Sequence, residues 1–475
     1  MNHKLKTLGA GILMILLFSL NNLNFGAYQT EAPKSPAIAI MGGILLDVET
    51  GKELNNYSII VEDNRIKEVA PSDQISPPAS AEVFDASGKW ILPGLIDMHC
   101  HLGNNEVNEV QALMNMYLAN GITTIRDVGG NVTQLRLLRR AVDSRKRMGP
   151  RLFFSGQILD GDPPLWPDLS FLVETPLQAE SAVKFLASQG VDCIKVYNSI
   201  KEPVLKVIIE TAQTYNLPVV GHIPRSMTMT RAVELGMKGL EHVRITGKEL
   251  LPPDEANSID FLPYAKRETL LWQRFDLDSK KMRRLISLLV DHKVFLDPTL
   301  SAAEATFVLT PSIQIKHPNN AYLPSQIFDN WMEWYKNIEN DDIYSIPPEM
   351  KKAALEGYEK RKRFVALCAQ AGVQILAGTD GPDLGTLLPG FGLHHELELL
   401  VEAGLETLQA IQAATLEAAR ALNREHDIGS VDAGKLADLV ILNANPFENI
   451  ANINKIYLVI KDGEIYDPMK IMVKR

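Results

Sequence analysis

Both ends of the chain carry β-like patterns, whereas the middle alternates between short apolar runs and helical stretches. Residues 38–92 hold short runs of alternating hydrophobic and polar positions, separated by turn residues and without a helical period. The same pattern returns near the other end, over 438–442 and 456–465. We therefore expect one small β-sandwich domain built from both chain ends, with its two parts over 31–92 and 426–475.

The region between these ends, 93–425, has the pattern of repeated strand–helix units. Stretches such as 179–189 and 203–215 have a helical period and lie between short apolar runs. Eight such units predict an α/β protein with a TIM-like (β/α)8 barrel, whose chemistry sits at the carboxyl ends of the strands. The expected strands cover residues 95–101, 123–127, 151–156, 192–197, 218–222, 239–242, 294–297 and 373–377.

Two long connections follow the sixth and seventh expected strands, over 248–293 and 301–372. The second includes Trp331, Trp334 and Tyr335 at a spacing that fits one helix. These aromatic residues either form a packing face or line a lid or pocket wall over the barrel mouth.

Residues 1–30 have the composition of a signal peptide. Lys4 and Lys6 precede an apolar run over 8–20, which is short for a membrane span, and a polar Asn-rich stretch follows. We expect cleavage near 26–30 and export to the periplasm or the medium, without stable membrane insertion afterwards. An uncleaved single-pass anchor is the alternative.

Composition narrows the classes of partner. The 475 residues are 46% hydrophobic, which allows a large core, and the net charge is −10. No cluster of Lys and Arg interrupts this acidic balance, so we expect no nucleic-acid partner. With only Cys100, Cys193 and Cys368, an exported chain of this size does not rest on a disulfide framework. Whether the chain forms a homo-oligomer stays open.

Side chains that bind metals gather at the ends of the expected strands. His99 and His101 lie two apart on one strand and so project from the same face, as a zinc-type ion requires. A lysine, two further histidines and an aspartate lie at the ends of four later strands. Because the carboxyl ends of barrel strands meet at one face, we expect these side chains to converge. The set is His99, His101, Lys195, His222, His242 and Asp380.

These residues, in this order, resemble the metal-binding set of the metal-dependent amidohydrolase superfamily. The segments 92–97 and 434–440 are also similar to that superfamily, and the resemblance covers about residues 38–468. Within the superfamily, 195–197 and 394–405 look closest to the prolidase-like, Xaa-Pro dipeptidase-type binuclear enzymes.

The resemblance implies two divalent metal ions. His99 and His101 would hold one ion with Asp380, while His222 and His242 would hold the other. Burial beside two cations favours the neutral amine of Lys195. In related enzymes that amine takes up CO₂ to give a carbamate that bridges both ions, and a Lys195–carboxylate salt bridge is the alternative. Imidazole ligands favour zinc, while manganese, cobalt and iron stay open.

The expected chemistry is attack on a carbonyl by a metal-bridging hydroxide, since two metal ions lower the pKa of a bridging water. Asp380 would take the hydroxide's proton and deliver it to the leaving amine, with a helix N-cap as its alternative role. Tyr197 either donates a hydrogen bond to the oxyanion or the substrate, or packs as an aromatic ring. Arg225 and Arg244 either bind a substrate carboxylate or form structural salt bridges.

Two further pairs are expected to be structural. Arg126 and Asp127 would form an ion pair at the end of the second strand. His394 and His395 would begin the helix after the eighth strand as solvated or capping residues, with a pocket-facing role for one of them left open.

The sequence thus predicts an exported binuclear hydrolase that cleaves a carbon–nitrogen bond in a small peptide, as a prolidase-like dipeptidase does. A cyclic amide, ester or lactone hydrolase of the same superfamily is the alternative. Similar imidazolone-ring enzymes generally use one metal without the bridging lysine, so Lys195 argues against that class. A non-catalytic, metal-stabilised binding protein is a remote alternative.

Overall fold

The computed structural model describes residues 37–104, 107–337, 343–472 and 474. The expected signal peptide over 1–30 lies outside these residues. Across the described part of the chain, no helix combines the length and hydrophobicity needed to cross a bilayer. Cys100, Cys193 and Cys368 are all free and buried.

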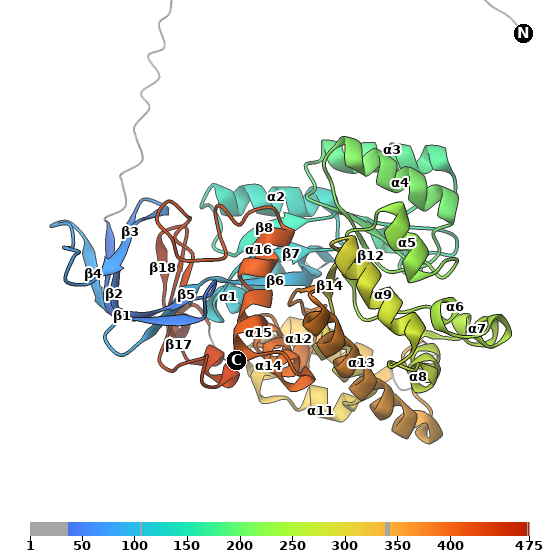
Figure 1. Cartoon of the computed structure of the whole chain (residues 1–475). Helices are drawn as coiled ribbons and strands as arrows, with labels where there is room; N and C mark the ends of the chain where they lie inside the picture. The colour runs from blue at the N-terminus through green and yellow to red at the C-terminus, as the bar shows by residue number, and fades with distance from the viewer. Residues whose placement is uncertain (1–36, 105–106, 338–342, 473, 475) are drawn as a thin grey trace, which may run out of the picture. The chain divides into compact units, whose positions relative to one another are not determined.

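Strands from both chain ends pair in a single sheet of order β18-β17-β16-β5-β1-β2-β3 (Figure 1). The sequence predicts a sandwich, but the sheet instead branches at β1, which changes register midway. Its residues 38–41 pair with β4, and residues 44–45 pair with β5. The strands are β1 (Ile38–Asp47), β2 (Lys52–Glu62), β3 (Arg65–Pro71), β4 (Glu82–Asp85), β5 (Trp90–Pro93), β16 (Leu439–Leu442), β17 (Ile456–Lys461) and β18 (Glu464–Tyr466).

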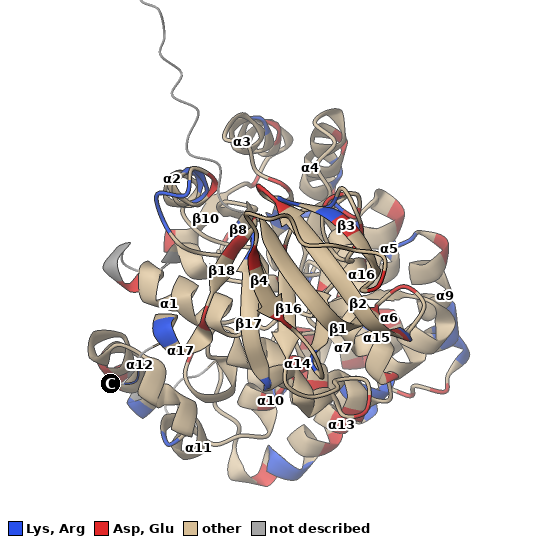
Figure 2. Ribbon diagram, turned by 90° about the vertical axis from the view of Figure 1, so that its left-hand side faces the viewer, with Lys and Arg blue, Asp and Glu red and all other residues tan. Residues whose placement is uncertain are grey.

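The central strand β16 is buried on both faces, which explains its uninterrupted apolar sequence. Leu439 and Ile441 pack in the small sheet's own core with Ile40. Val440 and Leu442 point the other way and join the large core around the parallel sheets. Figure 2 faces this small sheet, whose strands are mostly uncharged, whereas Lys, Arg, Asp and Glu lie largely on the surrounding helices.

All eight expected strands of the middle region are present, in two parallel sheets of order β6-β7-β8 and β10-β9-β11-β12-β13-β14-β15. Hydrogen bonds link the two sheets at both ends: Met98 N–H donates to Ala377 O (3.0 Å), and Asp192 N–H donates to Phe154 O (2.9 Å). The strands are β6 (Leu95–Cys100), β7 (Ile122–Asp127), β8 (Arg151–Phe154), β11 (Ile194–Val196), β12 (Val219–Gly221), β13 (Gly239–Glu241), β14 (Phe295–Asp297) and β15 (Gln374–Ile375).

Two strands of the second sheet were not predicted, β9 (Ile158–Asp160) and β10 (Ser170–Leu172). β9 pairs with β11 through Leu159 and Val196, at the edge that faces β8. They flank residues 161–168, whose glycine and prolines indicate a loop rather than strands.

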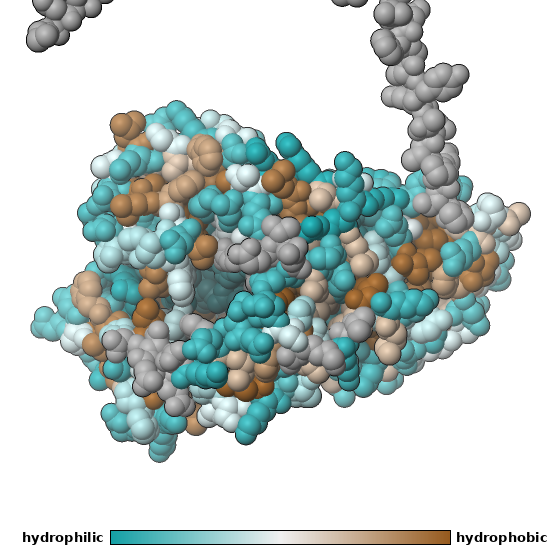
Figure 3. Space-filling model, turned by 180° about the vertical axis from the view of Figure 1, so that it is seen from behind, coloured by the Kyte–Doolittle hydropathy of each residue, from teal (hydrophilic) through white to brown (hydrophobic). Residues whose placement is uncertain are grey.

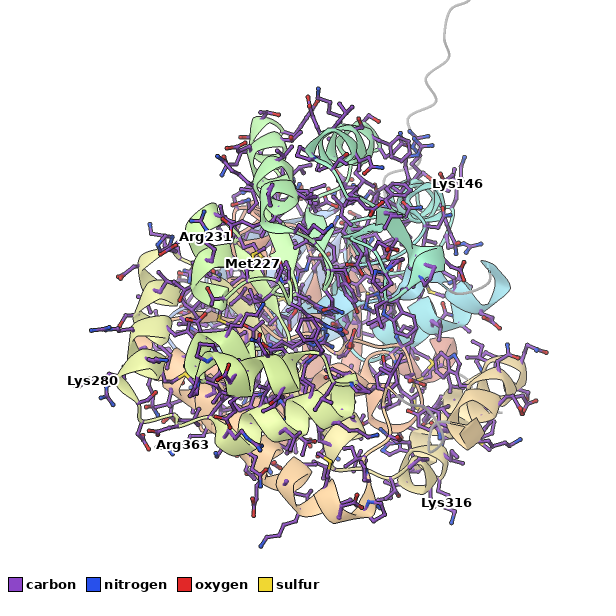
Figure 4. All side chains as sticks on the ribbon, turned by 90° about the vertical axis from the view of Figure 1, so that its right-hand side faces the viewer. Lys146, Met227, Arg231, Lys280, Lys316 and Arg363 are labelled. Carbon is purple, nitrogen blue, oxygen red and sulfur yellow. The ribbon has the colours of Figure 1, made fainter. Side chains whose placement is uncertain are left out.

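The two long connections are themselves helical, and helices cover the parallel sheets (Figure 1). The expected helices at 179–189 and 203–215 are found as α3 and α4, and the Trp331–Tyr335 aromatics fall in the single helix α12. In Figure 4, Lys280 on α9 projects from the periphery, whereas Met227 lies inside. The helices are α1 (Val107–Ala119), α2 (Val132–Asp143), α3 (Pro176–Ser188), α4 (Glu202–Thr214), α5 (Met229–Leu235), α6 (Gly247–Leu250), α7 (Pro253–Asp260), α8 (Tyr264–Arg274), α9 (Lys280–Asp291), α10 (Leu300–Phe307), α11 (Pro311–Ile315), α12 (Ser325–Asn337), α13 (Lys351–Ala371), α14 (Phe391–Ala403), α15 (Thr407–Ala413), α16 (Leu416–Ala421) and α17 (Pro468–Ile471).

Candidate functional site

The four histidines named from the sequence stand together at the carboxyl ends of the parallel strands. His99 lies in β6, while His101, His222 and His242 follow directly after β6, β12 and β13. The ring centroids of His99 and His242 are 4.8 Å apart, and those of His222 and His242 are 5.0 Å apart. The ring of His101 lies 5.3 Å from that of His99.

Asp380 joins the histidines from the segment after β15. Its Oδ1 lies 3.0 Å from His101 Nε2 and 3.2 Å from His99 Nε2. The backbone N–H groups of Thr379 and Asp380 both donate to the carbonyl oxygen of His99, at 3.1 and 2.8 Å, and so hold this segment against β6. Ligand atoms of His99, His101 and Asp380 all lie within 4.8 Å of one another, close enough to share one ion.

Lys195 is buried at the same site, on β11. Its side chain is 1% exposed, and its Nζ has no hydrogen-bond or ion-pair partner among the described residues. Burial lowers the pKa of Lys195 and favours the neutral amine, although the carboxylates of Glu241 and Asp380 oppose this shift. A buried ammonium without a partner is energetically costly, so the neutral amine is favoured. The lone pair of this nitrogen is then available for reaction.

Each of three histidines is oriented by a polar neighbour at Nδ1. A ring that donates its Nδ1 proton keeps the lone pair of Nε2 free for a metal ion. Burial lowers the pKa of both His222 and His242 well below the usual value, which favours neutral rings. The Nδ1 partners are Glu241 Oε2 for His99 (2.7 Å), Asn198 Oδ1 for His222 (3.0 Å) and Thr299 Oγ1 for His242 (2.6 Å).

The backbone is strained where it presents these groups. His242, Thr299 and Asp380 have left-handed φ values of 64°, 44° and 62°. Such a conformation costs a non-glycine residue on the order of 1–3 kcal/mol and persists where surrounding contacts impose it. Before His222, a Cβ on Gly221 would lie 2.2 Å from the carbonyl oxygen of Val196, so this position requires glycine.

A buried ion-pair network beside His99 was not found from the sequence. Glu241 is 1% exposed and accepts hydrogen bonds from His99 Nδ1 and from Arg126 Nη2 (2.8 Å). Arg126 Nη2 also lies 3.5 Å from Asp297 Oδ2. The available signal was a glutamate at the end of the buried strand β13, directly before His242.

The predicted ion pair between Arg126 and Asp127 is wrong. Successive residues of β7 point to opposite faces, so the two side chains cannot meet. Arg126 pairs with Glu241 inside the sheet, while Asp127 accepts the backbone N–H groups of Gly103 and Gly129.

A cavity of about 700 Å³ lies beside the histidines. His101, His242 and Asp380 line one side of it, and α8, α10 and α13 provide much of the rest. Figure 3 shows a hollow in the face of the chain that is turned away from the viewer of Figure 1. A cavity of this volume holds a small-molecule ligand.

Tyr197 lines this cavity and packs against His222 as an aromatic ring. Its ring lies 3.8 Å from the ring of His222, measured between centroids. Its hydroxyl oxygen accepts a hydrogen bond from Trp166 Nε1 at 3.2 Å. Because an indole N–H only donates, the tyrosine hydroxyl keeps its own proton to donate to a ligand.

The two arginines named from the sequence differ in their position relative to the cavity. Arg244 lines the cavity, has no ion pair with a described carboxylate, and stacks over Tyr264 at 4.5 Å. Its Nη1 lies 3.1 Å from His222 Nδ1. This ring nitrogen can accept a hydrogen bond from Arg244 or donate one to Asn198, but it cannot do both at once. Arg225 is absent from the described cavity wall, and burial together with Arg267 and Arg244 lowers its pKa to about 10.

His394 and His395 also lie outside the described cavity wall. His394 is buried, and its Nε2 lies 2.8 Å from the carbonyl oxygen of Asn120. His395 Nε2 lies 2.6 Å from Glu304 Oε2. The expectation of a solvated or capping role is therefore wrong for His394, which fixes α14 against the end of α1.

Comparisons with known proteins agree with this arrangement. The model of the amidohydrolase family matches residues 90–466. The imidazolonepropionase of Clostridium tetani is 24% identical over 469 residues, covering 87% of this chain and 93% of that protein. A prolidase candidate from Bifidobacterium longum is 25% identical, with a TM-score of 0.66 over 91% of this chain and 95% of that one. A Xaa-Pro dipeptidase with methionine in its active site shares the fold, at 22% identity and a TM-score of 0.66 over 91% and 100% of the two chains.

Proposed function

Because the chain belongs to the amidohydrolase family, we propose that it is a binuclear metal hydrolase that cleaves the amide bond of a small peptide-like substrate. One observation carries this proposal. His222 Nε2 and Lys195 Nζ are buried without a hydrogen-bond partner among the described residues, at the same site as His99 Nε2, which lies 3.2 Å from Asp380 Oδ1. Buried polar atoms are normally paired, so two such nitrogens beside a carboxylate and further imidazoles fit a site built for cations.

We infer that the eight strands close into a (β/α)8 barrel. The hydrogen bonds at both junctions between the parallel sheets support closure, as does the parallel bridge between Cys100 and Gly381. This arrangement accounts for a site at the carboxyl ends of five different strands.

Two bound ions, best suited to zinc by the imidazole ligands, would polarise a carbonyl and make water a nucleophile near neutral pH. His99, His101 and Asp380 are placed to hold one ion, and His222 and His242 the other. Lys195 would supply a further ligand as a carbamate, formed when its neutral amine attacks CO₂ and releases a proton.

The chain's own residues supply proton transfer and substrate positioning. Asp380 Oδ1 and Oδ2 lie among the histidines, where this carboxylate is placed to take a proton during attack and give it to the leaving amine. The free hydroxyl proton of Tyr197 is suited to the developing oxyanion. The unpaired guanidinium of Arg244 is suited to a carboxylate on the leaving half.

We further propose export through residues 1–30 to the periplasm or the medium, because a basic start and a short apolar run precede the folded region. Mass spectrometry of the mature N-terminus after expression with the native leader tests this. A chain recovered from the cytoplasm with Met1 intact contradicts it.

The activity is tested by metal analysis and a substrate panel on one preparation. Protein reconstituted with zinc in bicarbonate buffer should hold two ions per chain and hydrolyse Xaa-Pro dipeptides or related amides. Absence of both bound ions and amide hydrolysis contradicts the proposed function.

Hydrolysis of a cyclic amide is the second candidate, because the sequence matches imidazolonepropionases along most of its length. The same panel therefore includes cyclic amides and lactones. Turnover of a ring substrate with no cleavage of any open-chain amide favours this candidate.

A further inference from the structure

The cavity wall across from the histidines is made largely by aromatic and small apolar side chains. Tyr264 lies 5.9 Å, between ring centroids, from both Phe307 and Tyr344. Ala302 and Ala303, about one turn earlier on α10, are small residues that also line the cavity. With a volume of about 700 Å³, the cavity is in the range that binds drug-sized ligands and exceeds the need of two small residues.

Glu268 borders the cavity, yet its charge is already matched. Its Oε1 accepts a hydrogen bond from Arg267 Nη2 (3.2 Å), and its Oε2 accepts one from Arg361 Nη2 (3.1 Å). All three side chains are no more than 7% exposed. This group therefore carries a net positive charge and offers no counter-ion to a substrate ammonium.

The other two carboxylates in the described cavity wall also already have hydrogen-bond partners. Asp383 accepts a hydrogen bond from the backbone N–H of Leu384 (2.7 Å) and one from the Tyr335 hydroxyl. Burial raises the pKa of Asp383 to about 7, which further weakens its negative charge. Asp380 is held by the site histidines.

The free charge in the wall is positive. Arg244 lines the cavity without an ion pair to any described carboxylate, and Arg361 lines it beside Phe307, over whose ring it stacks at 4.2 Å. A substrate carboxylate is attracted to these guanidinium groups, whereas a buried α-ammonium would be unpaired and repelled.

We propose that the acyl half of the substrate is bulky, apolar and uncharged, so that the enzyme cleaves N-acylated amino acids in preference to free dipeptides. The carboxylate of the amino-acid half lies at Arg244, and the acyl group lies against α10, Tyr264 and Phe307. This inference rests on the proposed amide hydrolysis and adds the class of substrate.

The first test compares two substrates that differ only in the α-amino group, 3-phenylpropanoyl-proline and phenylalanyl-proline. The zinc-reconstituted enzyme should have a kcat/KM at least about tenfold higher for the uncharged substrate, since an unpaired buried charge is costly. A smaller advantage, or a preference for phenylalanyl-proline, overturns the proposal. Alanine and leucine replace proline in both substrates if the proline pair is not cleaved.

The second test reduces the space in front of α10. Ala302→Phe should lower the ratio of kcat/KM for 3-phenylpropanoyl-proline over acetyl-proline at least about tenfold. Ser181→Phe, on the exposed side of α3, is the control and should leave this ratio unchanged. An unchanged ratio in folded Ala302→Phe overturns the placement of the acyl group, and Thr306→Phe replaces this variant if it does not fold.

The two proposals fail in different ways. If no amide is hydrolysed, the proposed function is wrong, and calorimetric binding of the same matched pair then decides the inference. At least about tenfold tighter binding of 3-phenylpropanoyl-proline supports an uncharged apolar ligand. Equal binding, or tighter binding of phenylalanyl-proline, contradicts it.

Discussion

The two sides of the cavity are built from different kinds of structure. The strand-end side carries His101, His242 and Asp380 on short segments that directly follow buried parallel strands. The opposite side comes from α8, α10 and α13, which belong to the two long connections. The candidate metal-binding side chains therefore lie on the strand-end side, while the helical side supplies much of the remaining wall.

The two sides also treat buried charge differently. At the strand ends, two buried nitrogens, His222 Nε2 and Lys195 Nζ, have no hydrogen-bond partner among the described residues. On the helical side, the carboxylate oxygens of Glu268 both accept hydrogen bonds from arginines. The first side is suited to receiving ions, whereas the second is already paired and stabilises the wall.

The largest effect is expected on the strand-end side, from Asp380→Asn. An amide cannot take the proton that a carboxylate takes, so kcat should fall about 10⁴-fold while the chain stays folded. Kinetics and metal analysis on the same sample measure this. Lys195→Ala is the companion variant and should lose one or both ions; full activity of either variant contradicts the assigned roles.

On the helical side, Glu268→Gln should act on stability. Losing one charge of a buried network leaves Arg267 and Arg361 unpaired, and the free energy of unfolding should fall by about 3 kcal/mol. Denaturant unfolding measures the change. Glu255→Gln, in an exposed pair with Arg274, is the matched control and should cost less than about 1 kcal/mol. An equal loss of unfolding free energy in Glu268→Gln and Glu255→Gln would show that this network does not stabilise the cavity wall.

The orientation of His99 should depend on Glu241. In Glu241→Gln the new amide NH₂ faces His99 Nδ1, so Nδ1 must accept a hydrogen bond. The imidazole ring then carries its proton on Nε2, the nitrogen that would bind the ion. Metal affinity should fall about 10- to 100-fold in competition with a chelator. Glu202→Gln, in an exposed pair with Arg231, is the control and should retain wild-type affinity.

The last effect is on the helical side and depends on pH. Glu396 on α14 is buried and accepts the backbone N–H groups of Leu300 (2.8 Å) and Ser301 (2.7 Å), at the start of α10. Burial raises the pKa of Glu396 to about 7 from 4.5. The folded chain therefore holds this proton more tightly than the unfolded chain, and stability falls as pH rises from about 4.5 to 7.

Glu396→Gln removes this titration. Between pH 5 and pH 8, the variant should gain about 2 to 3 kcal/mol of unfolding free energy relative to the wild type. Denaturant unfolding at the two pH values measures the difference. Glu359→Gln, at an exposed glutamate paired with Lys362, is the control. If the unfolding free energies of the wild type and Glu396→Gln change with pH by the same amount, the prediction is contradicted.

The local sequence pattern was sufficient to predict which residues gather at the strand ends. The two-residue period placed His99 and His101 on one face, and the order of strand–helix units predicted that Lys195, His222, His242 and Asp380 would converge with them. Even the helix around Trp331 followed from spacing. These features depend on neighbours along the chain, which the sequence displays directly.

Partners that lie far apart along the chain were decided only by the tertiary structure. Glu241 meets His99, Arg361 meets Glu268, and Arg126 turns away from its neighbour Asp127. No local period records such pairings, because each depends on how separate strands and helices pack in three dimensions. The sequence therefore determined which groups gather at the strand ends, while packing decided which charges remain free to meet a substrate.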